Sequence, residues 1–323
     1  MAVDNLYVNG VIAVKETSLL KDKIYRMCEL GADDAFRMLT ESGFGGEAVS
    51  GCHEYEKLVA SDSAQIDAFI REYAPNNAVS EYLLSPRDFH NAKALVKAER
   101  IGSDGTQMLA PEGLVPIEVL RACFKNEDFN ALESELKQAV LTAREYIKED
   151  NVSGAQLGFI FDRALFKRLF RVCKRDKLLS KFVADKADMT NILIALRSSG
   201  ENLSEESFLE GGTLKKGQLA RLAAMDEKTV KEYASSPLYG FICDCFEAKQ
   251  NGAPYTAAER RLSSYEGAQL YKNQYELKGS LPFMSYVFRR RLENENVRIV
   301  FASLLNGMDD KQIKSRLRGV NQI

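Results

Sequence analysis

The chain has 323 residues, 45% of them hydrophobic and 28% charged, and its 44 Lys and Arg against 46 Asp and Glu leave a formal net charge of −2. This balance gives no bulk attraction to nucleic acid. No run of residues approaches the ~20 apolar positions that a membrane-spanning helix needs, so no transmembrane segment is expected.

The residue types also favour helices and offer little for chemistry. Only seven Pro and no Trp accompany many Leu, Ala, Glu, Lys and Arg, which are typical of long helices. The six Cys are dispersed in a chain without a recognisable signal peptide, so reduced thiols are expected. With only His53 and His90 besides, we predict no metal site, no cofactor and no catalytic residue.

Apolar residues at helical spacing recur along the chain, whereas strand-like alternation does not. The first segment, residues 5–21, could begin as a strand by residue propensity, but its apolar stripe favours a helix. In order, we predict helices over residues 5–21, 33–41, 54–74, 128–150, 155–184, 238–250 and 256–278, another after Pro282, and a short capped helix over 308–318.

Two glycine-rich stretches resemble nucleotide-binding loops only superficially. The cluster ending at Gly46 has no Lys-Ser or Lys-Thr after it, and Gln218 and Leu219 follow the pair Gly212 and Gly217. The lysine and hydroxyl that would contact phosphates and magnesium are therefore missing, and both stretches are interpreted as turns.

The helix expected at 155–184 is strongly basic. Its Phe residues at helical spacing favour a core-facing side, with the cations solvated or meeting an acidic partner. The alternative is a nucleic-acid surface, which needs basic charge and accessible aromatic rings together. The cations are Arg163, Lys167, Arg168, Arg171, Lys174, Arg175 and Lys177, and the aromatic residues are Phe159, Phe161, Phe166 and Phe170.

One motif occurs three times: an acidic residue, two intervening residues and an Asn, followed by small or apolar residues that predict a buried helix. Its copies are Asp88 with Asn91, Asp188 with Asn191, and Glu293 with Asn296. A basic residue lies two positions after the Asn in the first and third copies, as Lys93 and Arg298. A single copy is typical of a helix start, where such side chains bind free backbone N–H groups. Three copies in register suggest a shared architectural role instead.

The spacing of the motif predicts a long-period repeat rather than a short solenoid array. Glycine turns near Gly113 and Gly212, each followed by a short helix, recur at about the same interval. We therefore expect an all-α protein of three helical repeat units, over residues 1–107, 108–207 and 208–323.

The chain resembles the C subunit of bacterial and archaeal V-type (A-type) rotary ATPases, to which the d subunit of eukaryotic vacuolar ATPases is related. The resemblance covers essentially the whole chain. It rests on the three acid-x-x-Asn helices, the turn from Leu209 to Gly212 and, most specifically, the segment from Glu295 to Gly307. The start, from Tyr7 to Lys15, is similar too, but Gly10 to Ala13 replace the family's Ala-Arg-x-Arg after the Asn.

The resemblance implies a funnel-like arrangement of three pseudo-repeats with pseudo-threefold symmetry. It implies a non-catalytic rotor subunit, a socket that links the central-stalk subunits of D and F type to the membrane proteolipid ring. Such a protein couples ATP hydrolysis or synthesis to proton or sodium transport from the cytoplasmic face of the membrane, as a peripheral protein. The acid-x-x-Asn residues would then hold helix ends or contacts between units.

Two other classes of function stay open at this point. A cytosolic helical-repeat adaptor or nucleic-acid-binding protein could use the basic segment 163–177. An enzyme with an unrecognised pocket is the third possibility.

Overall fold

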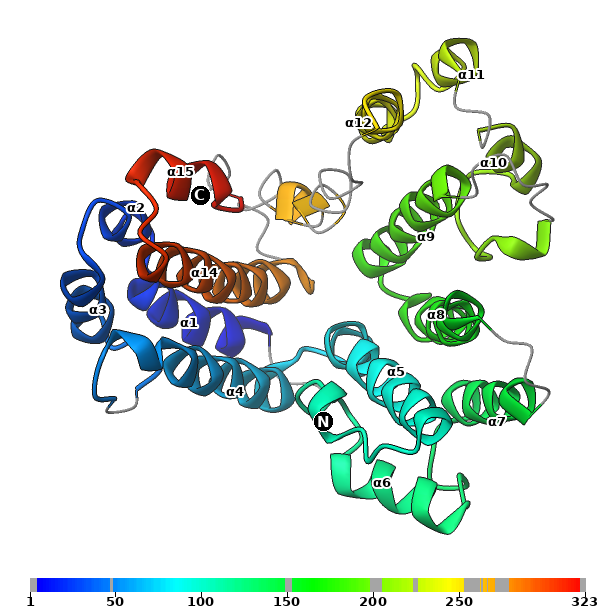
Figure 1. Ribbon diagram of the computed structural model, residues 1–323, viewed down its shortest axis with the longest axis horizontal. Coiled ribbons are helices and arrows are strands. Elements are labelled where there is room, and N and C mark those ends of the chain that lie inside the picture. The colour runs from blue at the N-terminus through cyan, green and yellow to red at the C-terminus, as the bar shows by residue number, and fades with distance from the viewer. Residues whose placement is uncertain are drawn as a thin grey trace. The chain divides into compact units, whose positions relative to one another are not determined.

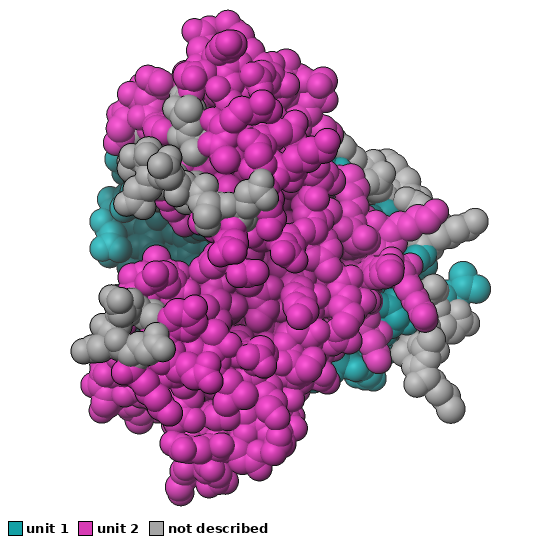
Figure 2. Space-filling view, turned by 90° about the vertical axis from the view of Figure 1, so that its right-hand side faces the viewer, with its two compact units in different colours: residues 1–76, 263–323 teal, residues 77–262 magenta. Residues whose placement is uncertain are grey.

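The computed structural model describes residues 5–46, 49–148, 153–197, 205–222, 226–252, 262, 264–265, 267–270 and 279–319. Within these ranges the chain is helical and contains no strand. None of the described helices has the length and apolar character required to cross a membrane. The chain forms two compact units, residues 1–76 with 263–323 (unit 1) and residues 77–262 (unit 2), which Figure 2 colours separately.

Unit 1 joins segments from both ends of the sequence. Its α-helices are α1 (Asn5–Lys15), α2 (Lys23–Met27), α3 (Ala32–Glu41), α4 (Tyr55–Tyr73), α14 (Leu281–Leu305) and α15 (Asp310–Arg316), with 3-10 turns η1 (Glu16–Ser18) and η2 (Cys52–Glu54). The long helix α14 lies beside α1 and α4 and also contacts α2, α3 and α15 (Figure 1).

Aromatic side chains fill much of the core around α14. Phe301 is fully buried, stacks on Tyr55 with ring centroids 5.4 Å apart and meets Phe36 edge-on. Farther towards the start of α14, Phe283 stacks on Phe69 of α4 at 5.2 Å. Offset and edge-on aromatic pairs add to the free energy gained from burying apolar area, so these contacts hold α14 firmly in unit 1.

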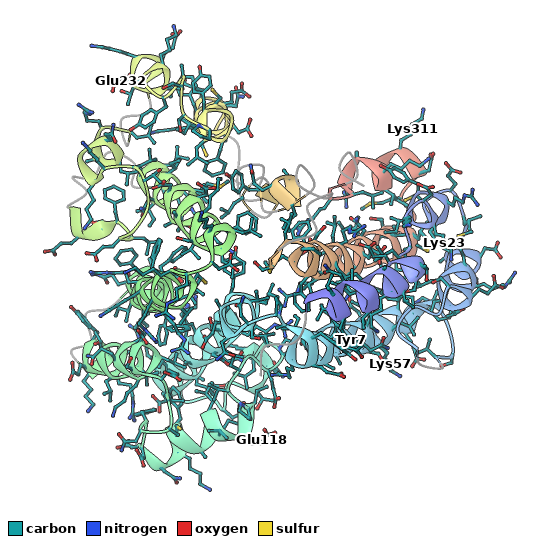
Figure 3. The ribbon with its side chains drawn as sticks, turned by 180° about the vertical axis from the view of Figure 1, so that it is seen from behind. Tyr7, Lys23, Lys57, Glu118, Glu232 and Lys311 are labelled. Carbon is teal, nitrogen blue, oxygen red and sulfur yellow. The ribbon has the colours of Figure 1, made fainter. Side chains whose placement is uncertain are left out.

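The first helix of unit 1 buries only one side. Val8 and Ile12 of α1 are buried, whereas Tyr7 is 59% exposed. Tyr7 is labelled on α1 in Figure 3, and its ring lies 6.3 Å from that of Tyr73 on α4. The helix expected over residues 5–21 is thus confirmed as α1, although it ends at Lys15.

Unit 2 is a run of consecutive helices. They are α5 (Asn77–Ile101), α6 (Ile117–Asn126), α7 (Ser134–Lys148), α8 (Gly154–Cys173), α9 (Lys177–Arg197), α10 (Lys216–Leu222), α11 (Glu227–Lys231) and α12 (Tyr239–Gln250), with 3-10 turns η3 (Thr106–Met108) and η4 (Glu205–Ser207). Helix α8 contacts α5, α7 and α9 (Figure 1). Phe161 and Leu157 of α8 join Val140 of α7 and Val96 of α5 in one buried cluster.

A buried cation also ties these helices together. Arg168 of α8 is only 5% exposed and donates to both carboxylate oxygens of Glu81 on α5, at 2.9 and 2.5 Å. The third guanidinium nitrogen, Nη1, lies 3.1 Å from Glu133 and 3.6 Å from Glu135 of α7. A buried charge requires such partners, so this arginine fixes α8 against α5 and α7.

Most predicted helices are confirmed, but two interpretations are wrong. Residues 155–184 do not form one helix, because Asp176 accepts the N–H groups of Leu178 and Leu179 and so begins a new helix, α9. The acid-x-x-Asn motifs do not start helices either; they lie inside α5, α9 and α14, whose early turns come well before them. Most of the helix expected over 256–278 lies outside the described residues.

Candidate functional site

The three acid–Asn pairs are buried in the middle of long helices. Each of the six side chains is at most 5% exposed: Asp88, Asn91, Asp188, Asn191, Glu293 and Asn296. An acid and an Asn three positions later lie on the same side of an α-helix, so each pair presents its polar groups in one direction. Buried polar groups need hydrogen-bond partners, which here are backbone groups of distant segments.

Each Asn binds both the N–H and the carbonyl of one residue. Asn91 Oδ1 accepts from Ala110 N at 2.8 Å, and its Nδ2 donates to Ala110 O at 3.2 Å. Asn191 makes the same two bonds with Leu209, at 2.7 and 3.0 Å. The partners follow the Asn by 19 and 18 residues, so the two copies fix equivalent points of the chain.

In the first two copies, the acidic residue holds the same loop a few residues farther on. Asp88 accepts from the N–H groups of Leu114 and Val115 at 2.9 and 3.0 Å. Asp188 accepts from the N–H groups of Thr213 and Leu214 at 2.8 and 3.0 Å. We call residues 110–115 and 209–214 the tethered loops; each leads directly into a short helix, α6 or α10.

The third pair has the same chemistry but takes its partners from both ends of the sequence. Asn296 makes its two bonds with Arg318, at 2.8 and 3.0 Å, 22 residues on. Glu293 accepts instead from the N–H groups of Leu20, at 2.6 Å, and Lys21, at 3.3 Å. Leu20 and Lys21 directly precede α2, as the tethered loops precede α6 and α10 (Lys23, the first residue of α2, is labelled in Figure 3).

Two glycines allow the tethered loops to approach the acids closely. A Cβ at Gly113 would overlap the carboxylate of Asp88, and one at Gly212 would overlap that of Asp188. Only glycine leaves room for this approach of backbone to side chain. The glycine turns singled out in the sequence are therefore the segments that the acid–Asn pairs bind.

Burial also changes the acidity of two of these acids. Desolvation raises the pKa of Asp88 to about 6 and that of Glu293 to about 7, although the backbone N–H groups that each accepts lower it. For Glu293, nearby Arg290 lowers the pKa further and Asp62 raises it. Loss of water is the larger effect at both sites.

The basic residue two positions after the Asn forms an ion pair with the neighbouring helix in both copies that have it. Arg298 Nε lies 3.0 Å from Glu56 on α4 within unit 1. Lys93 Nζ lies 4.0 Å from Asp162 on α8 within unit 2. Arg298 and Glu56 are about half exposed, so the pair orients the helices more than it stabilises them.

These contacts hold backbone segments against the three long helices. The hydrogen bonds described above join the six side chains to backbone groups, and the Thr213 hydroxyl adds a side-chain donor to Asp188. In the described ranges, no three His, Cys, Asp or Glu side chains converge as metal ligands would. His90 is exposed, with Nε2 3.2 Å from the Met108 carbonyl oxygen.

Comparison with known proteins identifies the same family that the motif resembles. A family model described as "ATP synthase (C/AC39) subunit" matches residues 8–316, which include all three acid–Asn pairs. The chain belongs to this family. It is 24% identical over 251 residues to the C subunit of the V-type ATP synthase of Thermus thermophilus, covering 74% of this chain and 78% of that one.

Two further relatives extend over nearly the whole chain. The C subunit of the V-type sodium ATPase of Enterococcus hirae is 20% identical, with 97% of this chain and 98% of the relative covered. The C subunit of the A-type ATP synthase of Methanocaldococcus jannaschii is 21% identical, with 96% of this chain and 85% of the relative covered. The resemblance to this family drawn from the sequence is thus confirmed.

The close approach at Gly212 predicts a sharp difference between two glycines of one segment. Gly212→Ala should lower the free energy of unfolding by roughly 1–3 kcal/mol, because the new methyl group displaces the Asp188 carboxylate from Thr213 and Leu214. Gly217→Ala is the matched control: its Cβ would meet nothing within 4 Å, and in helix α10 it should stabilise by about 0.5–1 kcal/mol. Urea unfolding measures both, and equal stability of the two variants would contradict this interpretation.

The amide of Asn191 predicts a larger effect. Asn191→Leu leaves the buried N–H and carbonyl of Leu209 without partners and should cost about 2–5 kcal/mol of unfolding free energy. The exposed Asn126→Leu serves as control and should change it by less than about 0.5 kcal/mol. If Asn191→Leu lowers the unfolding free energy no more than Asn126→Leu does, Asn191 does not hold the tethered loop at Leu209.

The raised pKa of Glu293 predicts how stability depends on pH. At a pH between the two pKa values, the folded protein keeps a proton on Glu293 that the unfolded chain has released. The stabilisation of the folded state by Glu293 is therefore complete below the pKa of the unfolded chain and is lost as pH rises through about 7. Glu293→Gln keeps an acceptor for Leu20 but cannot ionise. The unfolding free energy of the variant minus that of the unchanged protein should therefore rise by about 3 kcal/mol from about pH 5 to about pH 8. A difference that is constant over this range would count against a raised pKa.

Proposed function

We propose that the chain is a non-catalytic rotor subunit of a V-type ATPase or ATP synthase. In this role it links the central-stalk subunits of D and F type to the membrane proteolipid ring, and it couples ATP hydrolysis or synthesis to proton or sodium transport. It acts as a peripheral protein on the cytoplasmic face of the membrane. The observation that carries the proposal is the family match over residues 8–316.

The names of the relatives support a place in an ATP synthase or ATPase complex, but they do not identify the subunits that this chain contacts. The relatives from Thermus thermophilus and Methanocaldococcus jannaschii are subunits of ATP synthases, and the one from Enterococcus hirae is a subunit of a sodium ATPase. These names cover both ATP synthesis and ATP hydrolysis, and one of them names sodium. The proposal therefore assigns this chain a mechanical role that one component can have in all such complexes.

The repeated contacts support an arrangement of three related helical units, over residues 1–107, 108–207 and 208–323, in a funnel with pseudo-threefold symmetry. The acid of each pair binds a segment that leads into a short helix: α6, α10 or α2. A part that transmits torque needs loops that do not slip, and closely packed helices with tethered loops resist shear better than free loops. In this proposal the pairs keep the shape of the socket.

Two of the four aromatic residues that nucleic-acid binding through residues 163–177 would use are buried. Phe161 and Phe166 of α8 are 1% and 7% exposed, so neither ring offers a face on which a base could stack.

Reconstitution tests the proposed role directly. Complexes assembled with this chain should couple ATP hydrolysis to ion transport into vesicles, whereas complexes assembled without it should hydrolyse ATP in the detached soluble sector and transport no ions. Adding the purified chain back should restore coupling. If the stalk sector attaches to the membrane ring and transport is coupled in its absence, the proposed function is wrong.

A further inference from the structure

Helix α8 and the turn after it present a row of cations on the surface of unit 2. We call them the basic ridge: Arg163, Lys167, Lys174, Arg175 and Lys177, all exposed. Positions 163, 167 and 174 fall within about 40° of each other around a helix of 100° per residue, and the row from 163 to 174 is about 16 Å long. These three charges thus form a straight stripe, and Arg175 and Lys177 follow in the turn and at the start of α9.

The ridge differs from the two arginines between its members, which are already neutralised. Arg168 binds Glu81 and Glu133, and Arg171 Nε lies 2.7 Å from Glu135. The five ridge residues make no ion pair within the part of the chain that the structure describes. Arg163 instead lies over the ring of Phe159, 5.7 Å from its centroid.

Acidic neighbours of the ridge are occupied elsewhere. Asp162 faces Lys93 of α5, and Asp176 accepts the N–H groups of Leu178 and Leu179 at the start of α9. A protein of net charge −2 therefore carries a local stripe of positive charge that no acidic side chain of the described ranges pairs. Like charges at helical spacing repel one another, so the stripe is destabilising for the free chain and is relieved by an acidic partner.

The surroundings of the ridge favour a protein partner over a lipid surface. A helix that inserts into a membrane interface combines basic residues with large exposed apolar ones. The large exposed hydrophobic residues in the described part of the chain lie on other elements and none lies on α8 or α9, where Phe161 and Phe166 are buried. Exposed charge with no fully exposed large hydrophobic side chain beside it suits the polar rim of a protein interface.

We propose that the basic ridge docks an acidic α-helix of a partner protein. A straight row about 16 Å long matches a helix that presents Glu or Asp at four-residue spacing along one side. The inference goes beyond the proposed function, which does not assign a surface to any partner, and it stands on the charge pattern alone.

The test uses the full chain and a labelled helical peptide whose four Glu lie at i, i+4, i+8 and i+11, with binding followed by fluorescence anisotropy. A peptide of the same composition with its Glu distributed around the helix is the comparison. The ridge variant combines Lys167→Gln, Lys174→Gln and Arg175→Gln. The control variant combines Lys125→Gln, Lys148→Gln and Lys228→Gln, which neutralises three other exposed lysines of unit 2 and changes the net charge equally.

The one-sided peptide should bind at about 50 mM salt and lose affinity steeply as salt rises, because exposed charges are screened. The ridge variant should bind about tenfold more weakly or worse, and the control variant should bind as the unchanged chain does. Equal loss in both variants, equal binding of the two peptides, or no binding would overturn the proposal. Tighter binding of phosphatidylserine-containing vesicles or single-stranded RNA through the same three residues would overturn it in favour of those ligands.

Discussion

Backbone N–H and carbonyl groups that are removed from water must find hydrogen-bond partners, and this requirement governs how the loops of the chain are held. The loops after α5 and α9 run close to those helices, and side chains of the helices pair part of the loop backbone. Asn91 and Asn191 supply one donor and one acceptor to a single loop residue, and Asp88 and Asp188 accept two more N–H groups. The loops can therefore lie against the helices without leaving buried groups unpaired.

The same constraint explains why residues far apart in sequence belong to unit 1. Glu293 and Asn296 repeat the arrangement on α14, but the two bonded segments are Arg318 on one side and Leu20 with Lys21 on the other. Together they serve as the tethered loop of the third copy, drawn from two separate stretches. Aromatic packing of Phe301 and Phe283 then adds the apolar contacts that keep α14 in place in unit 1.

The recurrence of the motif and the positions of most helices could be predicted from the sequence, because apolar periodicity is a local signal. The partners of the motif could not, since periodicity identifies the buried side of a helix but not the loop that covers it. The available signal was Gly113 and Gly212, which follow their acids at nearly equal distances and leave room for the carboxylates. The burial of Arg168 was missed for a related reason, because its main partner Glu81 is 87 positions away.

The cations of α8 and of the turn after it form two groups. Arg168 and Arg171 are committed to carboxylates of unit 2, whereas the basic ridge is left for something outside the chain. A subunit of a rotary complex needs both kinds of residue: buried contacts that make it rigid and exposed charges that select its neighbours. Sequence alone shows the cations as one basic segment, and only the packing of α8 separates the two groups.

Hydrogen exchange of individual backbone amides tests the central claim, that the acid–Asn pairs hold the loops. The amides of Ala110, Leu209 and Arg318 donate to the three Asn side chains and lie outside helices, where unbonded amides exchange rapidly. The account predicts that all three are protected to a degree similar to the amides in the middle of α5, α9 and α14. Exchange as fast as that of the exposed loop residue Asp104 would show that the pairs do not hold these segments in solution, and would contradict this claim.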